Sequence, residues 1–189
     1  MACRCAPKPP YATTMPNYRR NFVPGGTYFF TVNLLDRKQD LLIRHVNALR
    51  AAVTTVRRSH PFEIVAWVVL PDHMHCIWTL PPGDANYSER WRLIKLLFAR
   101  AVPKGEPISS MRKERHERGI WQRRFWEHTI RDEADLNSHI DYIHYNPVKH
   151  GHAIEATEWS HSTIHRFIKE GVLETDWGDS AIDGAFGEA

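Results

Sequence analysis

The sequence predicts an α+β fold in which a ferredoxin-like antiparallel sheet carries helices on one face and is followed by an additional late helix. Runs of strand length alternate with segments of helical periodicity in the order strand, helix, strand, strand, helix, strand, helix. Two of the strand-like runs are separated only by a short turn. The 189 residues, 42% of them hydrophobic, are enough for one domain with a sizeable core.

The first half of the chain supplies three strands and one helix. Residues 27–34 follow a Gly-Gly pair and are rich in aromatic and β-branched side chains, so they predict a strand. In residues 41–58 the apolar side chains recur at the spacing of an amphipathic helix. Residues 62–70 and 73–80 are apolar runs joined by a Pro-Asp turn, and we expect them to pair as a hairpin of two central strands.

The second half supplies two helices and the last strand. Residues 87–102 show helical periodicity, whereas residues 103–122 are charged and irregular and predict a loop with a short helix. Residues 126–131 fit a strand. The late helix is predicted over residues 133–145, because Pro147 cannot donate a backbone hydrogen bond and disfavours helical geometry in the preceding residue.

Charge is distributed unevenly along the chain. The last 20 residues carry six carboxylates and no Lys or Arg, so the rest of the chain is more basic than the net charge of +3 indicates. We expect a flexible tail over residues 1–15, the folded domain over 16–169 and an acidic tail over 170–189. A basic domain favours a polyanionic partner, although many basic proteins bind no nucleic acid.

The pattern of cysteines and the lack of long apolar segments argue against a disulfide-bonded, zinc-knuckle or membrane-spanning protein. Cys3, Cys5 and Cys76 are odd in number and lack zinc-ligand spacing, which predicts neither a disulfide framework nor a zinc knuckle. No stretch resembles a signal peptide or approaches the ~18 apolar residues of a membrane span. We therefore expect a cytoplasmic protein without a membrane partner.

A His-x-His pair lies in the predicted strand 73–80. Side chains at i and i+2 of a strand face the same side, so His73 and His75 could meet one metal ion while Met74 packs on the opposite face. Two ordinary polar residues on an exposed strand face have the same spacing. The spacing alone does not decide between these interpretations.

A tyrosine and an asparagine are four residues apart in the late helix. If the helix persists to Asn146, the phenol of Tyr142 and the carboxamide of Asn146 share one face. Alternatively, Tyr142 and Tyr145 are packing residues and Asn146-Pro147 ends the helix.

Two segments interleave aromatic side chains with arginines. This combination stacks bases and follows a phosphate backbone, which suits single-stranded DNA. The alternative is that the tryptophans belong to the core, the arginines form a solvated edge, and the segment near the N-terminus is an ordinary tail. The candidate DNA-binding residues are Tyr18, Arg19, Arg20, Trp121, Arg123, Arg124 and Trp126.

Four ordered segments together resemble the REP-associated tyrosine transposases, which are relatives of the single-tyrosine HUH transposases of bacterial insertion sequences. The resemblance covers residues 16–168, and four segments in order are far more specific than any one of them. The segments are Gly25–Thr31, Leu70–His75, Trp121–His128 and Tyr142–Gly151.

The resemblance implies roles for individual residues. It makes Tyr142 the nucleophile on the late helix and His73 and His75 the ligands of a divalent ion, and it implies palindromic REP hairpins as the substrate. Asn146 is the third candidate metal ligand. The insertion-sequence relatives carry a glutamine at this position, and asparagine keeps the carbonyl oxygen but has a shorter reach. Ligation by nitrogen and oxygen suits Mn²⁺ and tolerates Mg²⁺, and two histidines would also accept zinc or nickel.

The expected activity is cleavage and transfer of single-stranded DNA through a 5′-phosphotyrosine intermediate. A tyrosine hydroxyl, with a reference pKa near ~10, is a poor nucleophile at neutral pH, so an ion that neutralises the phosphate fits the chemistry. Two alternatives are a metal-dependent phosphohydrolase that uses water and a non-catalytic DNA-binding regulator. We expect no nucleotide cofactor, and either a monomer or a homodimer.

Overall fold

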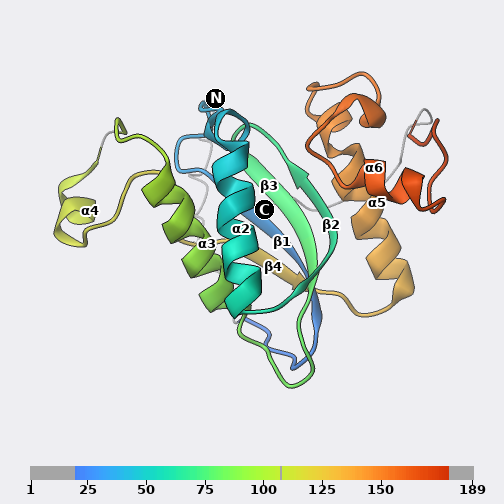
Figure 1. Cartoon of the computed structure of the whole chain (residues 1–189), viewed down its shortest axis with the longest axis horizontal. Helices are drawn as coiled ribbons and strands as arrows, with labels where there is room; N and C mark the ends of the chain where they lie inside the picture. Colours follow the sequence, from blue (N-terminus) through green and yellow to red (C-terminus); the bar gives the residue numbers. More distant parts are fainter. Residues whose placement is uncertain (1–19, 107, 179–189) are drawn as a thin grey trace, which may run out of the picture.

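The fold is built on a four-stranded antiparallel sheet, as the computed structural model shows for residues 20–106 and 108–178 (Figure 1). No helix in these ranges is long and apolar enough to cross a membrane. The elements are β1 (Thr27–Asn33), α1 (Leu41–Arg44), α2 (Val46–Ser59), β2 (Glu63–Val69), β3 (His73–Thr79), α3 (Tyr87–Ala101), α4 (Ser110–Glu114), β4 (Trp126–Thr129), α5 (Glu133–Lys149), the 3₁₀ helix η1 (Ala156–Glu158) and α6 (Ile164–Lys169).

The strand order is β2-β3-β1-β4, and every neighbouring pair is antiparallel. This order and the predicted succession of elements confirm the ferredoxin-like fold. The predicted hairpin forms, but only β3 is central; the expectation that β2 is also central was wrong. The outer edge of β2 is covered by residues 161–163, where the backbone N–H of Thr163 donates a hydrogen bond to the backbone oxygen of Trp67. This cover explains why an edge strand is as apolar as a central one.

Side chains alternate between the two faces of β1 and β3. On β3, Met74, Cys76 and Trp78 belong to the core that α2 and α3 cover. Ile77 and Phe29 of β1 belong to a second core that includes side chains of α5 and α6. The additional late helix α5 therefore lies on the face opposite α2 and α3, and residues of β3 contribute to both cores.

Two helices differ from their predicted bounds. The helix expected over residues 41–58 is divided at His45, whose φ of −118° and ψ of 33° depart from helical values. Helix α5 continues through Pro147 to Lys149. Proline has no N–H to donate, but the following amides still bond, for example His150 N to Asn146 O at 3.1 Å. The expectation that the helix stops at residue 145 was therefore wrong.

A buried histidine joins α5 to the segment before α6. His144 is fully buried; its Nε2 lies 3.0 Å from the Thr163 hydroxyl, and its ring meets the Phe167 ring edge-on. Burial, with a smaller contribution from Arg166, lowers the pKa of His144 to about 3. The folded protein therefore holds this imidazole neutral.

Acid should destabilise the protein through His144. His144 takes up a proton below about pH 6.5 in the unfolded chain but only near pH 3 in the folded chain. Its contribution to the free energy of unfolding is therefore fully present above pH 6.5 and is lost as the pH falls. The expected slope from this group is about 1.4 kcal/mol per pH unit. Urea unfolding at pH 7 and pH 5 measures it, and His144→Gln should show a smaller loss. An equal loss in both proteins would contradict the assignment.

Candidate active site

Strand β3 places two imidazoles side by side beneath α5. His73 and His75 point to the same face and are 3% and 1% exposed, and their ring centroids are 5.0 Å apart. The pairing with β1 sets Asn33 opposite His73 and Thr31 opposite His75. The strand spacing thus brings the two side chains together, as its period of two requires.

His73 is oriented by two charged side chains. Its Nδ1 lies 2.7 Å from Asp72 Oδ1 and 3.3 Å from an Arg37 guanidinium nitrogen, and Arg37 also forms an ion pair with Asp72. Burial lowers the pKa of His73 although Asp72 acts in the opposite direction. The neutral imidazole keeps Nε2 as the nitrogen that can bind a ligand.

His75 is oriented by a hydroxyl group. Its Nδ1 lies 2.9 Å from the Thr31 hydroxyl, whereas its buried Nε2 has no hydrogen-bond partner within the described part of the chain. Burial, followed by the charges of His73, His150 and Lys149, holds the pKa of His75 well below its usual value. A buried nitrogen without a partner needs an explanation, and a bound ion supplies one.

Helix α5 and the residue that follows it present three polar side chains at four-residue spacing above the two imidazoles. The ring of Tyr142 lies 5.1 Å from that of His75, and the ring of His150 lies 5.1 Å from that of His73. Asn146 lies between them on the same helix face, fully buried, and neither amide atom has a hydrogen-bond partner among residues 20–106 and 108–178. The continuous helix thus keeps Asn146 above the histidines despite Pro147.

The polar atoms of this site fit a divalent ion. Two imidazole nitrogens and a carboxamide oxygen are ligand types that Mn²⁺ accepts, and the unpartnered atoms of His75 and Asn146 fit the same purpose. The sequence analysis did not identify Thr31, Arg37 and Asp72. Thr31 and Arg37 lie far along the chain from the histidines that they contact. His150 is a further residue of the site that the sequence analysis did not identify, although it lies four residues after Asn146.

The phenol of Tyr142 is packed among aromatic and charged neighbours. Its side chain is 5% exposed, and its ring meets that of Phe29 edge-on at 5.8 Å. The ammonium of Lys149 lies 4.9 Å from the centroid of the Tyr142 ring. This contact places a positive charge beside the candidate nucleophile.

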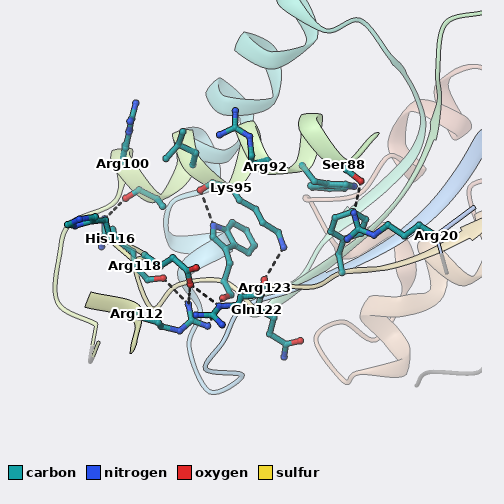
Figure 2. A pocket seen from close by; sticks show the side chains of 16 residues that line it. Arg20, Ser88, Arg92, Lys95, Arg100, Arg112, His116, Arg118, Gln122 and Arg123 are labelled. Carbon is teal, nitrogen blue, oxygen red and sulfur yellow. Dashed lines mark hydrogen bonds and ion pairs between the residues drawn. The ribbon is translucent and has the colours of Figure 1, made fainter. Parts of the chain in front are cut away.

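A basic groove of about 570 Å³ lies between α3 and the segment before β4 (Figure 2). Cationic side chains predominate in its lining, and aromatic side chains contribute to its apolar part. Its cations are Arg20, Arg92, Lys95, Arg100, Arg112, Arg118 and Arg123, its aromatic residues are Trp91, Trp121 and Phe125, and Glu117 is its one carboxylate in the described chain.

Lys95 is a half-buried cation of this groove. It donates a hydrogen bond to Gln122 O at 3.0 Å, and its ammonium lies 5.4 Å from the centroid of the Phe125 ring. Burial and the charge of Arg20 lower the pKa of Lys95 to about 8. Arg20 itself lies 4.3 Å above the Phe125 ring.

Some of the predicted DNA-binding residues lie in or near this groove, and one, Trp126, lies on the sheet face that carries His73 and His75. Trp121 is 7% exposed and belongs to the core, with its indole N–H bonded to Lys95 O, while Arg123 pairs with Glu117 at 2.9 Å. Trp126 is 36% exposed and lies 5.7 Å from Phe29. Arg20 lines the groove, whereas Arg124 is exposed and lies outside the groove. Tyr18 and Arg19 lie outside the described residues.

The segment of residues 121–126 lines the groove and also pairs with the edge of β1. Trp121 pairs with Leu34, the Gln122 amide bonds to Asn33 O, and Trp126 pairs with Thr31. Thr31 and Asn33 are the β1 positions opposite His75 and His73. A flexible polymer that crosses this edge would contact both the groove and the site.

The chain is similar to known transposases. It matches the family model described as "Transposase IS200 like" over residues 27–146. It is 47% identical to a REP-associated tyrosine transposase of Escherichia coli K12 over 92% of this chain and 98% of that protein. A solved structure of a REP-associated tyrosine transposase bound to a REP hairpin has a TM-score of 0.78 and 46% identity, and the match covers 93% of this chain and 98% of that one.

Proposed function

The chain belongs to the REP-associated tyrosine transposases, within the family of IS200-like transposases, and we propose that it cuts and rejoins single-stranded DNA at REP-type hairpins through Tyr142. As a transposase it is a DNA nicking and joining enzyme. The observation that carries the proposal is the position of Tyr142 beside His75, in a buried site that contains polar atoms without partners.

His73, His75 and Asn146 would hold a divalent ion, Mn²⁺ or Mg²⁺. Such an ion supplies positive charge to a nonbridging phosphate oxygen. The residues around the ligands prepare them for this role, because Asp72 and Thr31 engage the Nδ1 atoms and the Nε2 atoms are then the nitrogens that would bind the ion. Burial lowers the pKa of both imidazoles, which favours the neutral form that binds an ion.

Tyr142 would act as the nucleophile. Its phenolic oxygen loses its proton and forms a bond to phosphorus, while the bond from phosphorus to the 3′ oxygen breaks and that oxygen takes a proton. The products are a 5′-phosphotyrosine and a free 3′-hydroxyl. Because the covalent link retains the phosphodiester energy, attack by a second 3′-hydroxyl reverses the step and joins strands.

The test of the proposal is covalent capture. Incubation with a single-stranded REP-type hairpin and Mn²⁺ should give a protein–DNA adduct that survives denaturing electrophoresis. A phosphohydrolase that uses water would cleave without an adduct, and a non-catalytic regulator would bind without cleavage. Either result would overturn the proposal in favour of that alternative.

The basic groove and Trp126 support a single-stranded DNA partner. The solved relative is described as bound to a REP hairpin. Here cations and aromatic rings line the groove, and Trp126 lies beside Phe29 on the sheet face of the candidate site. Phosphates suit the guanidiniums and bases suit the rings. We therefore assign the groove to the substrate strand.

Replacing Arg123 and Arg124 together by Ala should weaken binding of single-stranded DNA. Each arginine that neutralises a phosphate contributes roughly 0.7 to the slope of log affinity against log salt concentration, so the slope should become shallower. Fluorescence anisotropy at several salt concentrations measures the slope. The matched control is the double variant Arg58→Ala and Lys169→Ala, which removes two exposed charges from α2 and α6, elements that contribute no residue to the groove, whereas Arg123 and Arg124 belong to a segment that lines it. Equal slopes in both double variants would assign Arg123 and Arg124 to structure alone.

A further inference from the structure

Three potential metal ligands gather outside the candidate active site, where β4 meets the first turns of α5. His128 lies on β4, and Asp135 and His139 lie one turn apart on α5. One ligand atom from each residue lies within 4.8 Å of the other two. We propose that His128, Asp135 and His139 bind a transition metal ion of the Zn²⁺ class that ties β4 to the helix carrying Tyr142.

Asp135 already stands between the two imidazoles. Nε2 of His128 lies 2.8 Å from one carboxylate oxygen, and Nδ1 of His139 lies 3.1 Å from the other. Ligands of a tetrahedral zinc ion, with bonds of about 2.0–2.2 Å, lie roughly 3.3 Å from each other. Both carboxylate–imidazole spacings are therefore close to those of a site. To form it, the imidazole nitrogens must approach each other, and Nδ1 of His139 must release the backbone oxygen of Asp135, which lies 2.8 Å from it.

The two imidazoles must also change their relative orientation. Their rings are stacked, with centroids 4.8 Å apart and planes 14° apart, whereas an ion lies near the plane of each ring that binds it. His139 packs against Phe29 at 4.8 Å, and its side chain is 15% exposed. The side chain of His128, on an edge strand, is 25% exposed, so it is the ring that turns.

The protonation states suit metal binding. Burial alone would raise the pKa of Asp135, but hydrogen bonds from His128 and Arg131 outweigh it and lower the pKa to about 2. Burial lowers the pKa of His139, which favours the neutral imidazole. Two imidazoles and one carboxylate form a ligand set of catalytic zinc sites, and nitrogen ligands favour such ions over Mg²⁺.

The cluster is joined to the candidate active site through one aromatic ring. Phe29 contacts His139, and its ring centroid also lies 5.5 Å from that of His75 and 5.8 Å from that of Tyr142. An ion bound at the cluster fixes α5 one turn before Tyr142. It acts by positioning the nucleophile and takes no part in the reaction.

Cobalt binding tests the proposal without DNA. Untagged full-length protein carrying Cys3→Ser and Cys5→Ser, which removes competing thiolates, is titrated with Co²⁺ and followed by calorimetry and visible absorption. Wild type should bind two equivalents, His75→Ala one, and His75→Ala with His139→Ala none. Asp135→Asn in the His75→Ala background should lower Co²⁺ affinity at least tenfold, whereas His152→Ala should leave it unchanged.

A second readout separates binding from misfolding. In the His75→Ala background Zn²⁺ should raise the midpoint of thermal unfolding, and adding His128→Ala should abolish that shift while circular dichroism confirms the fold. Absence of Co²⁺ binding in folded His75→Ala, or binding that survives removal of both His128 and His139, would overturn the proposal. None of these measurements depends on DNA cleavage, so they stand apart from the proposed function.

Discussion

Tyr142→Phe is expected to abolish the covalent protein–DNA adduct and to lower strand cleavage by roughly a thousandfold or more. The substitution removes one oxygen and leaves the ring against Phe29 and His75, so folding and hairpin binding should be retained. Adduct formation on a labelled hairpin with Mn²⁺ is the direct measurement, and anisotropy at equilibrium reports binding.

Tyr145→Phe is the matched control because it makes the same chemical change three residues further along α5. Tyr145 lies outside the row of Tyr142, Asn146 and His150 that faces the two histidines. It should form adduct at the rate of wild type. An inactive Tyr145→Phe together with an active Tyr142→Phe would transfer the nucleophile to the other tyrosine.

The second large effect is expected from the imidazoles. His75→Ala removes a ligand whose buried Nε2 has no partner in the described residues, and cleavage should fall on the order of 100-fold or more. Thr31→Val removes only the contact that orients His75, so it should weaken metal affinity about 10- to 100-fold and be rescued by more Mn²⁺. Cleavage measured against Mn²⁺ concentration distinguishes the two variants.

His60→Ala is the control, because His60 lies beyond the end of α2 and away from β3. It should cleave like wild type. Thermal unfolding must show that His75→Ala is folded before its activity is interpreted. If folded His75→Ala cleaves normally, or if wild type cleaves in excess chelator, the metal-binding role is wrong.

Much of the fold could be predicted because its signals are local. The alternation of β3 placed Met74 in one core and both imidazoles on the opposite face, and the order of elements predicted the topology. The edge position of β2 could not be predicted, because an apolar run shows that both faces are covered and says nothing of its edge. Its cover comes from residues 161–163, almost a hundred residues later.

The candidate site was only partly predictable for a related reason. His73, His75, Tyr142 and Asn146 follow from spacing and resemblance, whereas Arg37 reaches His73 across 36 positions. Pro147 shows the limit of a local rule, since the packing of α5 on the sheet carries the helix past it. The groove combines α3 with a distant segment, so no single stretch of sequence could show it.

The alternation of side chains along β3 limits how the protein can change through mutation. A one-residue slip in the pairing of β3 with its neighbouring strands would exchange the two faces of the strand, moving Met74 into the site and both imidazoles into the apolar layer beneath α2 and α3. Such a chain would lose its hydrophobic core in the same event that displaces its ligands. Selection for a folded chain therefore also preserves the register of the histidines, even in lineages where DNA cleavage no longer confers an advantage.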